Sequence, residues 1–340
     1  ALGNNLRQLV LTDFIRKDFQ IHLGDNNAEF AQLGVLSYFE SIRREIIKQS
    51  WSVPMAILTG SLVILPTSAK ESLEALIPKD RLSYDTIGKL NKNDYLKVNV
   101  SGSHHDLVTA LTQLFQDGYI QVIIGTKSLL GEGWDAPCVN SLILASFVGS
   151  FMLSNQMRGR AIRVWSDNPN KTSNIWHLVS INLSPKKWIE IQNAEEKYDE
   201  TLELQLYGLS PDLDLLERRM TQFLGLHYQE PTIESGIDRL DLNQITFSQK
   251  GLEKLNQNAI TLSQKRQELK DRWQQALPLY EDMEVVNQVE IDKQFLPLAY
   301  LNDWMKAFLI FQAFAATYFI IDVGRYLTVG KPFEQSLPIL

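Results

Sequence analysis

Two arginines that lie three residues apart, Arg160 and Arg163, have the chemistry to act on a phosphate. A guanidinium is always charged and can bond two oxygens at once, so it stabilises the charge that develops when a terminal phosphate is cleaved. A spacing of three places both side chains on one face of a helix, with Gln156 one turn earlier. Gly159 leaves room for close approach. Taken alone, these residues also fit a solvated basic helix end.

Further residues that suit contacts with phosphate or nucleotide precede the arginines. Thr126 follows an apolar run, and a hydroxyl beside exposed backbone N–H groups suits a nucleic-acid phosphate. Gly131 and Gly133 allow backbone conformations that are closed to other residues. Asp135 can accept a hydrogen bond from a ribose hydroxyl. An ordinary loop between a strand and a helix fits the same residues.

Strands and helices alternate over the first half of the chain. Apolar and β-branched runs predict strands at residues 7–15, 55–65, 96–100, 119–124, 141–147 and 175–181, and periodic stretches predict helices at 26–49, 68–76, 106–115 and 150–161. This alternation predicts an α/β fold with a parallel sheet and helices on both faces. Ligands of such sheets bind at the carboxyl ends of strands, where Gly102 and Thr126 lie.

The second half of the chain has a different character. Residues 1–185 contain 17 Lys and Arg against 16 Asp and Glu, whereas residues 186–340 contain the remaining 16 against 24. A surface that binds nucleic acid is therefore expected on the first half. Predicted helices at 187–206, 212–224 and 250–276 indicate a mainly helical accessory region. We therefore expect two domains, residues 1–185 and 186–340. The third helix fits an intramolecular hairpin better than a dimeric coiled coil.

Residues 304–323 are almost continuously apolar. Only 15 uncharged residues separate Lys306 from Asp322, which at ~1.5 Å per residue is shorter than a hydrocarbon layer of ~30 Å. We therefore expect a buried helix, ahead of a docking face for other sequence, with a membrane segment as the least favoured interpretation. The single cysteine, Cys138, excludes an internal disulfide framework and suits a reducing, cytoplasmic environment.

Two sequence motifs resemble those of superfamily 2 helicases of the DEAD/DEAH type. The stretch GTKSLLGEGWDAPCVNSLI at residues 125–143 looks like motif V, and QMRGRAIR at 156–163 looks like motif VI. The strand LVLTDFIR lies where the motif IV strand would be. Met157 and Trp134 depart from the residues usual in these motifs. The resemblance covers residues 6–183 and implies the second RecA-like domain of such an enzyme.

The resemblance assigns roles by position. Arg163 would be the arginine finger, and Arg160 a second contact to the γ-phosphate. Gln156, Gly133 and Asp135 would bind ATP, and Thr126, Gly102, Lys127 and Thr59 would contact the nucleic-acid backbone. DNA is the favoured partner, ahead of RNA.

The sequence contains no G-x-x-x-x-G-K-[ST] phosphate loop. The resemblance therefore implies that the first RecA-like domain, with the ligands of Mg²⁺ for bound ATP, is missing, and that this fragment alone is inactive. The five histidines, including the adjacent His104 and His105, do not predict a metal site. The alternative is a motor-inactive interaction scaffold within a restriction or defence complex, with contacts through residues 186–340.

Overall fold

A computed structural model describes residues 2–130, 134–145, 151–181 and 298–329, together with 210–280 except for 228, 231, 237 and 241–248. The chain divides into two compact units, residues 1–281 and 282–340. The predicted boundary between residues 185 and 186 lies outside the described residues and stays a prediction.

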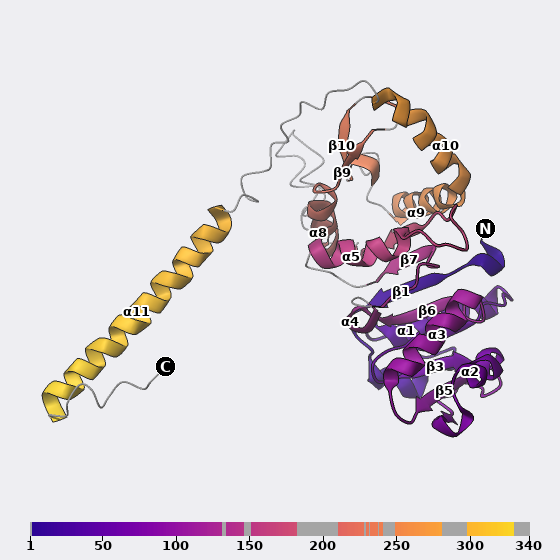
Figure 1. The fold of residues 1–340 in the computed structure, drawn as a ribbon, viewed down its shortest axis with the longest axis horizontal. Helices are drawn as coiled ribbons and strands as arrows, with labels where there is room; N and C mark the ends of the chain where they lie inside the picture. The colour runs from indigo at the N-terminus through magenta and orange to yellow at the C-terminus, as the bar shows by residue number, and fades with distance from the viewer. Residues whose placement is uncertain are drawn as a thin grey trace. The chain divides into compact units, whose positions relative to one another are not determined.

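A large sheet forms the centre of the first unit (Figure 1). Its strands are β1 (Gln8–Thr12), β2 (Met55–Leu58), β3 (Val63–Pro66), β4 (Leu82–Asp85), β5 (Tyr95–Val100), β6 (Val122–Thr126), β7 (Ser141–Leu144) and β8 (Asn174–His177). Their order is β4-β5-β3-β2-β6-β1-β7-β8. From β2 to β8 the neighbours pair in parallel, whereas the pairs β2–β3, β3–β5 and β4–β5 are antiparallel. The predicted α/β class is confirmed.

The antiparallel edge arises where the sequence predicted one strand region over residues 55–65, interrupted at residues 59–61. The hydroxyl of Thr59 donates to the carbonyl of Leu62 at 2.9 Å and accepts from the backbone N–H of Leu62 at 2.9 Å. These bonds close a tight turn, so the chain reverses and residues 55–65 become the hairpin β2–β3. The strand β4 was not predicted.

Helices lie against the sheet or follow it in the chain. They are α1 (Val35–Lys48), α2 (Lys70–Leu76), α3 (His104–Asp117), α4 (Lys127–Leu130), α5 (Phe151–Ile162), α8 (Pro211–Met220), α9 (Gln249–Gln264), α10 (Arg266–Ala276) and α11 (Leu298–Val329). A small antiparallel pair, β9 (Leu224–Leu226) and β10 (Ile233–Ser235), follows α8. Short 3-10 helices occur at Gly3–Asn5, Lys17–His22, Thr67–Ala69, Lys79–Arg81, Asp238–Leu240 and Leu277–Tyr280.

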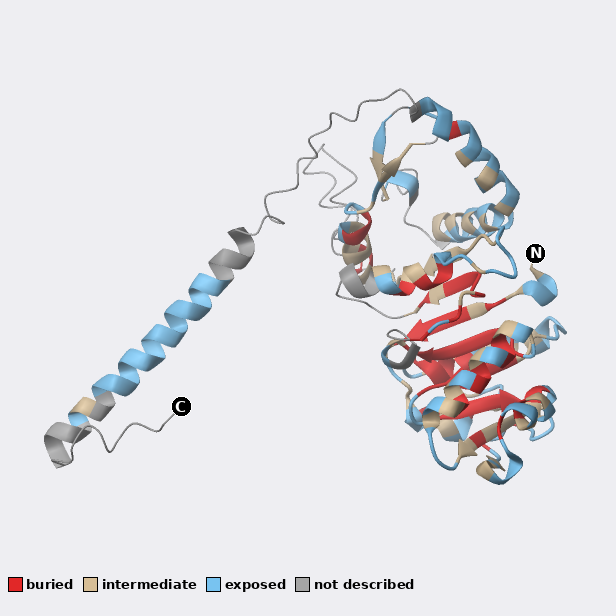
Figure 2. Ribbon diagram, in the orientation of Figure 1, coloured by how far each residue is buried: buried red, intermediate tan, exposed pale blue. Residues whose placement is uncertain are grey.

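Two hydrophobic cores cover the two faces of the sheet, as the alternation of side chains along a strand requires (Figure 2). Leu9 and Leu11 of β1 belong to the core that includes α2, α3 and α5. Val10, between them, belongs to the core that includes Phe39 of α1. The predicted placement of helices on both faces is therefore confirmed.

Two predicted helices have different bounds in the structure. The first begins at Val35 and not at residue 26, because the guanidinium of Arg44 reaches back to the carbonyls of Asp25 at 2.7 Å and Ala28 at 2.8 Å and holds that segment outside the helix. The long helix predicted at 250–276 is two helices, α9 and α10, which meet at Lys265 with a non-helical ψ of 51°.

The helices that follow the sheet are tied to its β7–β8 edge. Arg266, at the start of α10, donates to the carbonyl of Asn140 at 3.1 Å. The amide of Asn174 in β8 donates to the carbonyl of Ser263 in α9 at 3.1 Å. The backbone N–H of Ser180 donates to the carboxylate of Asp212 in α8 at 3.2 Å. These bonds explain why the sheet and α8–α10 form one compact unit.

In the second unit, the structure describes the single helix α11, and its residues 304–320 are exposed. Phe311 is 68% exposed and Phe314 72% exposed. The prediction of a buried helix at 304–323 is therefore wrong for residues 304–320, which are exposed in this structure. Among the described residues, none of the helices combines the length and the apolar character required to cross a membrane.

Candidate nucleotide and nucleic-acid site

The two predicted phosphate-binding arginines have different surroundings. Arg163 comes one residue after the end of α5, and its side chain is 50% exposed and forms an ion pair with the carboxylate of Asp135. Arg160 lies inside α5 and is only 6% exposed. Gln156 is exposed one turn before Arg160. Of the two arginines assigned to the γ-phosphate, Arg163 is therefore open to solvent, whereas Arg160 is buried.

Lys171 and Ser173 fix the end of α5 that precedes Arg163. The ammonium of Lys171 donates to the carbonyls of Val139 and Ala161, both at 2.7 Å, and the hydroxyl of Ser173 donates to the carbonyl of Ala161 at 2.5 Å. Burial lowers the pKa of Lys171 to about 8. Because Val139 precedes β7 and follows Asp135 closely, these bonds hold the two partners of the ion pair near each other.

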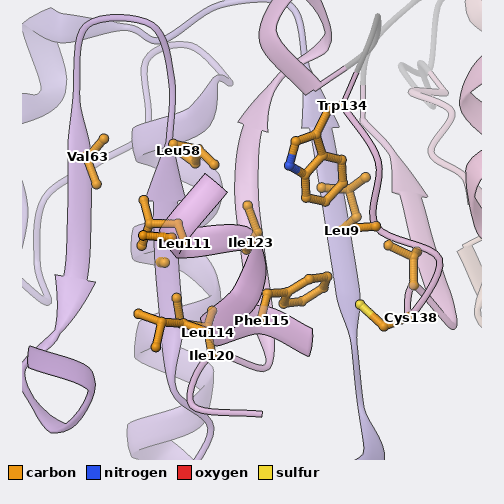
Figure 3. Close-up of a cluster of buried hydrophobic side chains, with 14 of the residues drawn as sticks. Leu9, Leu58, Val63, Leu111, Leu114, Phe115, Ile120, Ile123, Trp134 and Cys138 are labelled. Carbon is orange, nitrogen blue, oxygen red and sulfur yellow. The ribbon is translucent and has the colours of Figure 1, made fainter. Parts of the chain in front are cut away.

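Trp134 anchors the residue next to Asp135 in the interior. It is 6% exposed, and its indole N–H donates to the hydroxyl of Thr112 in α3 at 2.7 Å. Its ring lies 6.3 Å, between centroids, from that of Phe115 in the same helix. Figure 3 shows the indole within the core cluster that also contains Leu9. The sequence identified Trp134 as a departure from the motif but did not predict this anchoring role.

Several predicted contacts to nucleic acid lie at the carboxyl edge of the parallel strands. Thr126 ends β6 and is paired in register with Thr12 of β1. It is 6% exposed and accepts a hydrogen bond from the hydroxyl of Ser128 at 3.2 Å. Lys127 forms an ion pair with Asp13, which follows β1. Lys127 therefore lies at the edge where ligands bind, with a carboxylate partner.

Gly102 lies at a second place, just before α3, with a φ of 99° that favours glycine. A Cβ at Gly102 would lie 3.0 Å from a guanidinium nitrogen of Arg81. Arg81 donates to the carboxylate of Asp106 at 2.7 Å and to the carbonyl of Ser101 at 3.1 Å. Sequence reasoning missed Arg81, because only the antiparallel pairing of β4 with β5 brings it to Gly102.

The structure thus unites some predicted residues and separates others. It joins Arg163 to Asp135, and places Thr126 and Lys127 at one sheet edge, while Gly133 lies outside the described residues. The remaining predicted contact, Thr59, is fully buried, and its hydroxyl is engaged in the β2–β3 turn. Within the described ranges, no three His, Cys, Asp or Glu side chains are grouped closely enough to hold a metal ion.

Comparison with known proteins adds a distant structural similarity. No protein-family model matches the chain, and no curated protein matches it. Among solved structures, the chain is similar to a crystal structure of the C-terminal part of the Fun30 ATPase domain, with 12% sequence identity and a TM-score of 0.28. The similarity covers 64% of this chain and 46% of that one, so less than half of that structure is matched. At this TM-score the similarity carries no argument about activity.

Proposed function

We propose that this chain is the second RecA-like part of an ATP-dependent helicase or translocase that acts on nucleic acid, with DNA favoured. The observation that carries the proposal is the ion pair between Arg163 and Asp135. It leaves a guanidinium half exposed at the end of a helix that lies against the sheet and is fixed by Lys171. The similarity to motifs V and VI agrees with this assignment.

On the nucleotide side, Arg163 would contact the γ-phosphate of ATP bound with Mg²⁺. The first RecA-like domain would supply the phosphate loop and the Mg²⁺ ligands, which these 340 residues do not contain. Asp135 keeps the guanidinium of Arg163 in place before ATP arrives and becomes available to a ribose hydroxyl when Arg163 turns to the phosphate. Arg160 is 6% exposed, so contact with a phosphate requires its side chain to leave its present position.

On the nucleic-acid side, Thr126, Lys127 and Gly102 would contact backbone phosphates. Lys127 offers a cation at the sheet edge, and Arg81 places a second cation against Gly102 at the start of α3. Backbone N–H groups and cations bind phosphates without reading sequence, as a motor that moves along a strand requires. Closure of the two RecA-like domains on ATP would tighten this grip, and hydrolysis would release it.

The proposal is tested by Arg163→Ala in an assembly that joins this chain to a RecA-like domain with a phosphate loop. We expect the rate of ATP hydrolysis to fall by ~10³-fold or more, because an arginine finger contributes that much to phosphoryl transfer. The matched control is Arg272→Ala, since Arg272 is 52% exposed on α10 and forms only a loose pair with Glu268 at 3.7 Å. A variant rate within about threefold of the wild-type rate would remove the finger assignment.

The same assembly separates the motor from the alternative of an interaction scaffold. A motor hydrolyses ATP faster when a single-stranded oligonucleotide is added, and Lys127→Ala should weaken this stimulation. A scaffold shows no stimulated hydrolysis with any partner domain that supplies a phosphate loop. If wild-type assemblies hydrolyse no ATP while each part is folded, the motor assignment is wrong.

A further inference from the structure

Three cationic or titratable side chains meet where β8 ends, outside the site described above. His177 is the last residue of β8, Arg158 comes from α5, and Arg219 comes from α8. The guanidinium of Arg158 lies over the ring of Phe223, 4.0 Å from its centroid. α5 and α8 therefore bring positive charge to the end of β8, where the charges of Arg158 and Arg219 act on His177.

Arg158 and His177 each have a buried polar atom without a partner. Among the described residues, no carboxylate forms an ion pair with Arg158, and its Nη1 is buried without a hydrogen-bond partner, as is Nε2 of His177. Burial, and then the charges of Arg158 and Arg219, lower the pKa of His177 to about 4. A buried donor without an acceptor is costly and uncommon in folded proteins, so an anion at this place would relieve that cost.

The cluster also lies where a ligand can reach it. His177 is paired in register with Leu144 of β7, and Leu144 is paired with Leu11 of β1. His177 therefore lies at the same carboxyl edge as Thr126. The residues that follow it, Leu178 and Ser180, are exposed, so the cluster is just below the surface.

We infer that Arg158, His177 and Arg219 form a phosphate-binding site at the carboxyl edge of β8. The guanidinium of Arg158 can bond two phosphate oxygens, the neutral imidazole of His177 can donate one further hydrogen bond, and Arg219 adds a nearby positive charge. The phosphate is either free phosphate or a backbone phosphate of the nucleic acid that passes the same edge. The inference rests on the proposed function only if the phosphate belongs to a nucleic-acid backbone.

The test with free phosphate measures the unfolding temperature of the full chain in sodium phosphate and in sodium chloride of equal ionic strength. Phosphate should raise the midpoint by about 2–4 °C over chloride when it is well above its dissociation constant. The gain should disappear in Arg158→Gln and in His177→Leu, and persist in the exposed control Arg272→Gln. His177→Leu leaves the contact between Arg158 and Phe223 in place, so the test survives if Arg158→Gln does not fold.

The test with nucleic acid measures the affinity of a fluorescent single-stranded oligodeoxynucleotide at several salt concentrations. Loss of one phosphate contact should lower the slope of log affinity against log salt by about 0.7–1 in Arg158→Gln and leave Arg272→Gln unchanged. Loss of the phosphate effect or a lower salt slope in the variants supports the site. The experiment that shows the change identifies the source of the bound phosphate. If the phosphate-induced shift of the midpoint and the salt slope of oligonucleotide affinity are the same in the variants as in the wild type, the inference is overturned. If the wild type binds no oligonucleotide, the proposed grip fails, and the phosphate experiment alone decides the site.

Discussion

The indole N–H of Trp134 donates to the hydroxyl of Thr112 at 2.7 Å, although 22 residues separate them. This bond fastens the neighbour of Asp135 to α3, the helix that begins beside Gly102. The proposed nucleotide and nucleic-acid contacts are thus attached to one rigid helix. In the proposed motor, domain closure on ATP would therefore reach the nucleic-acid contacts through packed side chains.

Trp134→Phe tests the strength of this attachment. The ring remains in the core, but Thr112 loses a donor while its own bond to the carbonyl of Val108, at 2.7 Å, persists. We expect the free energy of unfolding to fall by about 1 kcal/mol, the usual net value of one hydrogen bond. Urea denaturation measures this change in the free energy of unfolding. Trp51→Phe is the control, because Trp51 is 60% exposed. An equal loss in both variants would show that the bond contributes nothing.

The α3 helix also shows what sequence reasoning predicts well. Its ends depend on local signals: the hydroxyl of Ser103 accepts from the backbone N–H of His105 at 3.2 Å, and Gly118 adopts a φ of 93°. The turn at Thr59 is also local: Thr59, Gly60 and Ser61 interrupt the apolar run, but the interruption did not predict that the chain reverses there. Local signals therefore predicted the ends of helices better than they predicted reversals of the chain.

Contacts between distant residues were the part that the sequence could not predict. The start of α1 depends on Arg44, whose partner Asp25 lies 19 residues away. Arg81 reaches Gly102 through strand pairing, and Arg158 meets His177 through the packing of α5 on β8. The motif pattern identified Arg163 and Asp135 as candidates but not their ion pair. Each of these contacts depends on the tertiary fold and leaves no periodic or local trace.

A double-mutant cycle on Arg163 and Asp135 separates stability from catalysis. The two side chains are 50% and 64% exposed, so solvent screens their attraction. We expect a coupling energy of ~0.2–1 kcal/mol in urea denaturation of Arg163→Ala, Asp135→Ala and the double variant. Raising the salt concentration should reduce it further. A coupling energy above about 2 kcal/mol would show a structural ion pair and weaken the case for a finger that turns to ATP.

Glu40 offers a contrasting prediction for a buried ion pair. It is fully buried in α1 and accepts from Nε of Arg43 at 2.8 Å and from Nε of Arg44 at 3.0 Å. Glu40→Ala should lower the free energy of unfolding by ~3–5 kcal/mol, because the charge of Arg43 would remain buried without its partner. Glu45→Ala, whose carboxylate side chain is 49% exposed, should change it by less than about 0.5 kcal/mol. Comparable losses of unfolding free energy in Glu40→Ala and Glu45→Ala would show that burial of the ion pair does not set its contribution.

His177 should make the chain sensitive to acid in a defined range. Burial and the neighbouring charges of Arg158 and Arg219 lower its pKa from 6.5 to about 4. Between these values the unfolded chain binds a proton that the folded chain does not, so stability is full above pH 6.5 and falls as the pH drops towards 4. His177→Leu should remove this part of the loss. The measurement is the urea midpoint of both proteins from neutral to acid pH in chloride. Parallel curves for the two proteins would show that His177 titrates normally.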